Sequence, residues 1–65
     1  MNQFPPLPLE SIEQAAARVR MKSAGVARVR DGQGFAERVA REFPKAQVTY
    51  RASVGSYNVS WVVFP

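Results

Sequence analysis

Apolar and polar side chains alternate along residues 48–64, VTYRASVGSYNVSWVVF, near the C-terminal end of the chain. Strict alternation is typical of a strand with one buried face, because successive side chains point to opposite sides of a sheet. The alternation is interrupted at residues 53–56, where Gly55 can adopt the positive φ of a tight turn. The pattern predicts a β-hairpin whose apolar face carries Val48, Tyr50, Ala52, Tyr57, Val59, Trp61 and Val63.

The turn also sets which residues of the two strands face each other. The predicted pairs are Ala52–Tyr57, Tyr50–Val59 and Val48–Trp61, all on the apolar face. A shift of one residue would move the apolar side chains of one strand to the other face, so the register is strongly specified. A two-stranded hairpin is only marginally stable in water, and we expect it to have further partners in the fold.

Two segments have the spacing of amphipathic helices. Over residues 8–23, apolar side chains recur on one side at Leu9, Ile12, Ala16 and Val19. Pro8 suits the first helical position, and Gly25 follows as a natural stop. Over residues 34–43, a second apolar face contains Phe35, Ala36, Val39, Ala40 and Phe43. We predict one helix in each segment, the second ending before Pro44.

The short segment of residues 26–30 lies between the two helices and has two interpretations. As a strand, it completes an α-β-α-β-β order, which predicts a small two-layer α+β domain. Placing this strand beside the last one gives a three-stranded antiparallel sheet of order 1-3-2. Both helices then cover the face that carries Tyr50, Val59 and Trp61. As a loop or helix, the segment leaves the order α-α-β-β.

Prolines are dense at the N-terminal end, where residues 4–8 read Phe-Pro-Pro-Leu-Pro. Proline favours extended backbone, so we predict an extended arm over residues 1–7 and a single domain over residues 8–65. The string resembles the Phe-Pro-x-apolar-Pro core bound by EVH1 domains and the Pro-Pro-Leu-Pro core bound by some WW domains. This resemblance implies a ligand for such a domain. The alternative is an arm that lies over the domain, with Phe4 or Leu7 covering apolar surface.

Length and composition restrict the chemistry and the location of the protein. The chain has 65 residues, which corresponds to one domain, and it contains no Cys and no His. Disulfides, Cys- or His-based metal sites and His-based acid–base catalysis are thereby excluded. No apolar run approaches the roughly 20 residues of a membrane-spanning helix, and the N-terminus lacks a secretory pattern. We expect a cytoplasmic protein without a metal, a cofactor or a membrane association.

The five acidic residues all have ordinary structural roles in this scheme. Glu10 and Glu13 lie near the N-terminal end of the first helix, where negative charge is favourable. Asp31, Glu37 and Glu42 fall in a turn or on a solvated helix face beside Arg side chains. No acid is expected beside a second acid in a buried site, and no residue receives a catalytic role. The sequence therefore predicts a protein that is not an enzyme.

Positive charge is the main functional feature of the sequence, and a net charge of +4 favours acidic partners. In the predicted sheet, Arg28, Arg30 and Arg51 flank the central strand on the uncovered face. The candidate partner-binding residues are Arg28, Arg30, Arg51, Asn58, Ser60 and Phe64, and a second basic patch contains Arg18, Arg20 and Lys22. A solvated face that protects a sheet from aggregation has the same composition.

Arg side chains pair with carboxylates or phosphates through bidentate hydrogen bonds. We therefore expect a small non-enzymatic binding protein, of the adaptor or inhibitor type, that docks this surface on an acidic protein or nucleoprotein partner. The alternative is a nucleic-acid-binding module that uses the basic open face of the sheet. Such modules interleave exposed aromatic and Arg side chains, whereas most aromatic residues here are expected in the core. Both a monomer and a homodimer fit the sequence.

Overall fold

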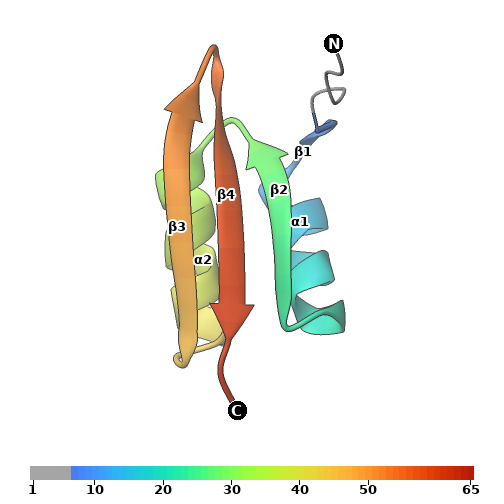
Figure 1. Ribbon diagram of the computed structural model, residues 1–65, viewed down its shortest axis with the longest axis vertical. Helices are drawn as coiled ribbons and strands as arrows, with labels where there is room; N and C mark the ends of the chain where they lie inside the picture. Colours follow the sequence, from blue (N-terminus) through green and yellow to red (C-terminus); the bar gives the residue numbers. More distant parts are fainter. Residues whose placement is uncertain (1–6) are drawn as a thin grey trace, which may run out of the picture.

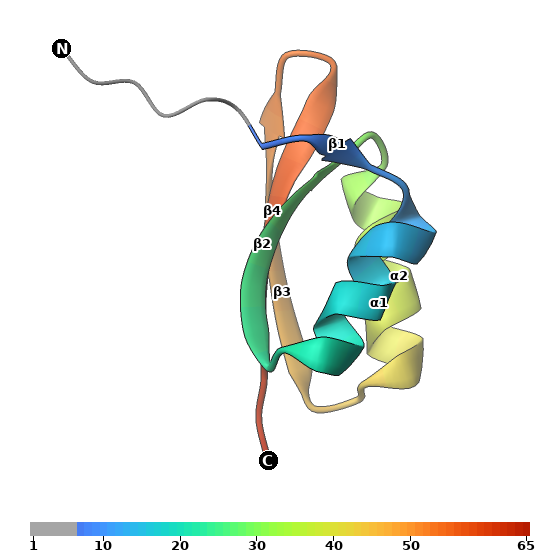
Figure 2. The same cartoon turned by 90° about the vertical axis from the view of Figure 1, so that its right-hand side faces the viewer.

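The computed structural model describes residues 7–65, so the predicted arm over residues 1–7 lies outside the described residues except for Leu7. The elements are β1 (Leu9–Glu10), α1 (Ile12–Met21), β2 (Ala24–Val29), α2 (Gly32–Glu42), β3 (Ala46–Ser53) and β4 (Ser56–Val63). The strands form one sheet in the order β1-β2-β4-β3, and both helices lie on one of its faces (Figure 1; Figure 2). The predicted two-layer α+β architecture is confirmed.

The C-terminal hairpin has the predicted register. The observed pairs of β3 and β4 include Ala52–Tyr57, Tyr50–Val59 and Val48–Trp61. Gly55 in the turn has a φ of 71°, a conformation that side chains with a Cβ rarely adopt. β4 also pairs with β2 in antiparallel orientation, so the most apolar strand is central, as predicted.

The sheet has four strands, and the prediction of a three-stranded antiparallel sheet missed one of them. β2, β4 and β3 do lie in the predicted order, which excludes the α-α-β-β alternative. β1 adds to the outer side of β2 as a short parallel strand, through the pairs Leu9–Arg28 and Glu10–Val29. Both strand–helix–strand connections are right-handed, the hand that twisted strands favour (Figure 1).

Helix capping explains why both helices begin elsewhere than predicted. The Ser11 hydroxyl accepts the Gln14 N–H, and the Ser11 N–H donates to Gln14 Oε1, each at 3.1 Å. This reciprocal capping box begins α1 after Ser11, so Pro8 precedes the helix. At α2, the Asp31 carboxylate accepts the Gly34 N–H at 2.9 Å, and the helix therefore begins at Gly32, two residues before its predicted start.

Trp61 lies at the centre of the core with 1% of its surface exposed. Its ring centroid is 6.0 Å from that of Phe35 in α2, so a helix covers the face that carries Trp61, as predicted. The indole also lies directly against Gly25 in β2, where an added Cβ would be 2.5 Å from Trp61 Cζ2. Its Nε1–H donates to the Lys22 carbonyl at 3.1 Å. The buried cluster contains Ala15, Val19, Ala27, Val29, Phe35, Val39, Val59 and Trp61.

Replacing Trp61 with Ala should lower the free energy of unfolding by about 3–5 kcal/mol, because elements on both sides of the ring prevent the cavity from collapsing. The control is Val62→Ala, since Val62 is the next residue of β4 and is 42% exposed on the other face. This control should cost less than about 1 kcal/mol. Urea unfolding followed by circular dichroism measures both, and equal destabilisation would contradict a core centred on Trp61.

Candidate binding surface

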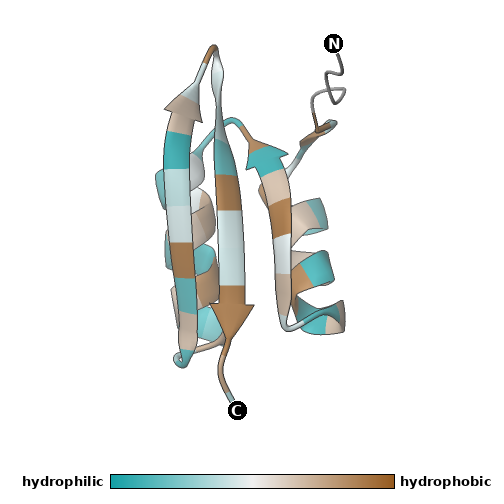
Figure 3. Cartoon of the chain, viewed as in Figure 1, coloured by the Kyte–Doolittle hydropathy of each residue, from teal (hydrophilic) through white to brown (hydrophobic). Residues whose placement is uncertain are grey.

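One face of the sheet is left uncovered by the helices (Figure 2). Alternation along β2, β3 and β4 projects a mixed set of side chains from this open face. Its residues are Ala24, Val26, Arg28, Gln47, Thr49, Arg51, Asn58, Ser60 and Val62. Arg28, Arg51 and Asn58 lie toward the hairpin turn, whereas the C-terminal end of β4 is hydrophobic (Figure 3), with Gln47 of β3 opposite Val62. We refer to these residues together as the open face.

Three of the predicted binding residues form one row across the open face. Arg28 of β2 lies opposite Asn58 of β4, which in turn lies opposite Arg51 of β3. Neighbouring strands are about 4.8 Å apart, so about 10 Å separates the Cα atoms of the two Arg residues. Ser60 follows in the next row of the same face. The structure therefore brings together four of the predicted residues.

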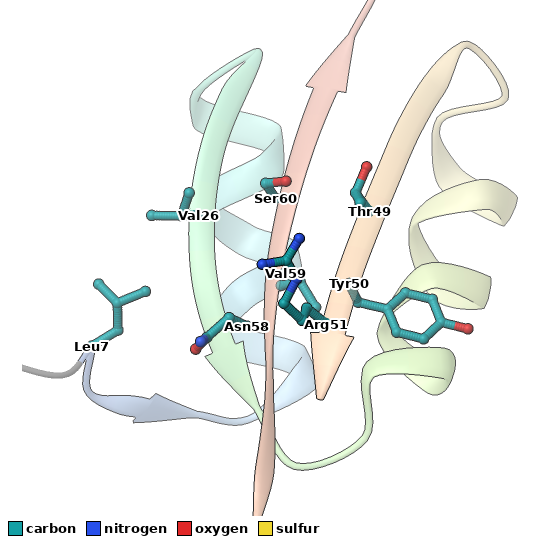
Figure 4. Close-up of a pocket in the computed structure, with 8 residues that line it drawn as sticks. All are labelled: Leu7, Val26, Thr49, Tyr50, Arg51, Asn58, Val59 and Ser60. Atoms are coloured by element: carbon teal, nitrogen blue, oxygen red, sulfur yellow. The ribbon is translucent and has the colours of Figure 1, made fainter. Parts of the chain in front are cut away.

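A shallow hollow of about 430 Å³ lies on the open face beside this row. It is lined by Leu7, Val26, Thr49, Tyr50, Arg51, Asn58, Val59 and Ser60. Figure 4 shows Leu7 and Val26 on its β2 side and the Arg51 guanidinium turned over β4. Hydroxyl and amide groups lie between them. A carboxylate that pairs with Arg51 would thus find hydrogen-bond donors beside it and apolar surface next to them.

Arg51 and Arg28 differ in how free their guanidinium groups are. Arg51 is exposed and makes no ion pair within residues 7–65. Arg28 Nε donates to the Ser56 hydroxyl at 2.9 Å, and its Nη1 donates to the Leu7 carbonyl at 3.3 Å. Arg28 therefore holds Leu7 at the rim of the hollow, and Arg51 is the cation available to a partner.

Arg30 and Phe64 lie away from this hollow, although the sequence predicted them on one binding surface with Arg51 and Asn58. Arg30 follows the end of β2 and lines a different hollow, which also contains residues 9–12 and Asp31. Phe64 follows the end of β4, six residues beyond Asn58, which at strand spacing is about 20 Å away. Its N–H donates to the Lys45 carbonyl. Both residues lie just beyond the end of a strand, and the alternation of side chains does not predict where a strand ends.

The predicted second basic patch is not a group of three free cations. Arg20 forms an ion pair of 2.6 Å with Glu42, which joins the ends of the two helices. Lys22 is exposed and has no ion pair within residues 7–65. Arg18 is engaged as well, so only Lys22 keeps its charge free for a partner at this site.

Arg18 links α1 to the sheet through three contacts. Its guanidinium donates to the Glu10 carboxylate at 2.7 and 3.2 Å, in a bidentate ion pair. It also donates to the Val26 carbonyl at 2.6 Å, on the outer side of β2. The guanidinium carbon lies 5.6 Å from the Trp61 ring, within cation–π distance. Arg18 is therefore a structural residue.

Five lining residues of the hollow were not predicted as binding residues, and two of them, Tyr50 and Val59, were expected on the apolar face instead. Val26 and Thr49 carry a signal in the sequence, because they alternate in phase with Arg28 and Arg51. Leu7 carries none, since its place depends on the hydrogen bond from Arg28. Sequence alternation thus finds the open face, and a tertiary contact completes the hollow.

Each acidic side chain has a partner that explains its position. The contacts are Glu10–Arg18, Glu13–Arg38, Glu42–Arg20, Glu37–Gln33 and Asp31 with the Gly34 N–H. Among the described residues, no three acidic side chains gather into a group that could hold a metal ion. In the same part of the chain, neither helix is long and apolar enough to cross a membrane.

Arg18→Lys should lower the free energy of unfolding by about 1–2 kcal/mol, because an ammonium cannot keep the bidentate pair and the carbonyl contact together. Arg20→Lys, which keeps the charge in a simple surface pair, should cost less than about 0.5 kcal/mol. The shift of the urea midpoint for the two variants is the measurement. A larger loss for Arg20→Lys would contradict the role assigned to Arg18.

The open face, with Arg51 above its hollow, is the feature of the described residues best suited to bind a partner. Arg51 and its polar neighbours supply donors for an acidic group, and Leu7 and Val26 supply apolar contact. Comparison with models of protein families, with curated proteins and with solved structures finds no match to this chain.

Proposed function

We propose that this chain is a small non-enzymatic binding protein that docks its open face on an acidic protein surface, as an adaptor or an inhibitor. The observation that carries the proposal is the position of Arg51. Its guanidinium lies over the middle of the sheet, free of ion pairs within residues 7–65 and next to Asn58 and Ser60 (Figure 4).

The surroundings of Arg51 support a protein partner. Interfaces between proteins combine Arg anchors with apolar contacts and a polar rim. Here Leu7 and Val26, 37% and 50% exposed, supply apolar surface beside the guanidinium. The net charge of +4 would speed the encounter with an acidic partner.

The placement of aromatic side chains gives less support to nucleic acid. Single-stranded nucleic acids stack their bases on exposed aromatic rings beside cationic groups. Trp61 is buried, and Tyr57 and Tyr50 belong to the face on which the helices pack. Phe64 is exposed, but it lies at the far end of β4 from Arg51. We therefore favour a protein with carboxylates as the partner.

The test compares Arg51→Glu with Arg41→Glu in affinity capture from a cell extract, quantified by mass spectrometry. Arg41 is exposed on α2, makes no ion pair within residues 7–65, and gives the same change in net charge. A protein captured by the wild type should be retained by Arg41→Glu. Arg51→Glu should reduce its capture about tenfold or more, because a paired carboxylate then meets a like charge.

Nuclease treatment of the extract separates the two classes of partner. Capture that survives nuclease supports the protein partner. Capture that disappears with nuclease, and that falls steeply between low and moderate salt, would favour the nucleic-acid alternative. Undiminished capture by Arg51→Glu would place the binding surface away from the open face.

A further inference from the structure

The two edges of the sheet differ in how far other parts of the structure cover them. On the β2 side, β1 pairs with the end of the strand, and Arg18 donates to the Val26 carbonyl. On the other side, within residues 7–65, β3 pairs with β4 alone, and its outer edge is unpaired from Val48 to Ala52. Exposed edges of this length bind further strands unless the protein blocks them. The β3 edge is therefore a candidate docking site.

The hydrogen-bonding groups that this edge presents follow from its register. The Phe64 N–H donates to the Lys45 carbonyl, so Lys45 and every second residue after it turn toward β4. Val48, Tyr50 and Ala52 consequently turn their N–H and C=O groups outward. Within residues 7–65 these groups have no backbone partner. They form a regular template for another strand.

β3 lacks the features that usually prevent an edge strand from pairing with another strand. Its pairing with β4 is continuous from Ala46 to Ser53, without a bulge, and it contains no Pro. Arg51 is its single charged residue. An edge strand guarded against association would carry more charge, a Pro or a break in register. The strand is long, regular and open instead.

Side chains on both faces of the edge would contact an added strand. Tyr50 is 41% exposed and lies on the helix-covered face, close to Gly32 of α2. Thr49 and Arg51 lie on the open face. Successive side chains of an added strand would therefore meet Tyr50 on one face and Arg51 on the other. This favours a segment that alternates apolar and acidic residues.

A single extended segment fits this edge better than a second copy of the chain. α2 packs behind β3, the edge strand itself (Figure 1; Figure 2). Two copies joined through β3 would place their strands about 4.8 Å apart, whereas packed helices need about 8–10 Å between axes. The two α2 helices would then collide. A strand with no helix behind it meets no such obstacle.

We infer that the acidic partner supplies an extended segment that adds to β3 as a fifth strand of the sheet. This inference rests on the function proposed above and identifies how the partner is bound. Main-chain hydrogen bonds to Val48, Tyr50 and Ala52 hold the segment, and a carboxylate on its open-face side pairs with Arg51. An apolar side chain on the other side covers the exposed part of Tyr50.

The probe is a short, end-capped peptide of alternating valine and glutamate, titrated into the full chain and followed by NMR. The amides of Val48, Tyr50 and Ala52 should exchange rapidly in the free protein and become protected when peptide is added. Thr49 and Arg51, whose amides already face β4, are the internal reference. Absence of new protection at millimolar peptide overturns the inference. Protection that instead develops as the chain alone is concentrated also overturns it, because a second copy then occupies the edge.

Two modified peptides give the matched control. One carries N-methyl groups on its valines and the other on its glutamates, so only one of them loses the amides that face β3. That peptide should bind about tenfold more weakly, and the other should bind nearly as well as the parent. The identity of the weaker peptide reports the direction of the added strand. In an antiparallel pair the residues directly opposite Val48, Tyr50 and Ala52 donate their amides to β3, whereas in a parallel pair the residues between them do. Equal affinity for both overturns strand addition.

Arg51→Glu separates this inference from the proposed function. If both hold, the variant should bind the peptide about tenfold more weakly. Amide protection that is unchanged in Arg51→Glu would support strand addition and contradict acidic docking. Capture of a partner that depends on Arg51, together with equal binding of both methylated peptides, would support acidic docking and contradict strand addition.

Discussion

The packing of Trp61 is the interaction on which the rest of the structure depends. One indole ring contacts Gly25 of β2 and Phe35 of α2, receives the Arg18 guanidinium on its face, and donates to the Lys22 carbonyl. It therefore joins both helices to the central strand and its neighbour. A chain of 65 residues buries only about 60% of its unfolded surface, so a single large side chain carries much of the core.

The short length of the chain also leaves one face of the sheet and one edge exposed. Two helices are enough to cover one face of a sheet this size, and no further helix or strand of residues 7–65 covers the other. On the open face, Thr49, Arg51, Asn58 and Ser60 interrupt the apolar positions. Within residues 7–65, the outer edge of β3 has no equivalent of the Arg18 contact that protects β2. Both proposals concern this exposed corner, where face and edge meet at Arg51.

Three Arg residues illustrate how one side chain type takes different roles. Arg18 is bound to a carboxylate and a carbonyl and lies over an aromatic ring, so its charge is used within the fold. Arg28 holds Leu7 and Ser56. Arg51 has no partner within residues 7–65, and its guanidinium faces solvent over the sheet. Net charge alone does not distinguish these roles.

Local periodicity was sufficient to predict the hairpin, its register, the buried position of Trp61 and the face that carries Arg51 and Asn58. Each of these follows from side chains that alternate along one strand, which is information contained in neighbouring residues. The strand β1, the rim formed by Leu7 and the engagement of Arg18 and Arg28 were not predictable in this way. They depend on hydrogen bonds between different elements of the fold, such as Glu10 of β1 with Arg18 of α1, and Leu7 with Arg28 of β2. The sequence by itself therefore determined which side chains share a face, and only the tertiary structure decided which of the charged ones remain free, because pairing a charge requires a second element to bring its partner into contact.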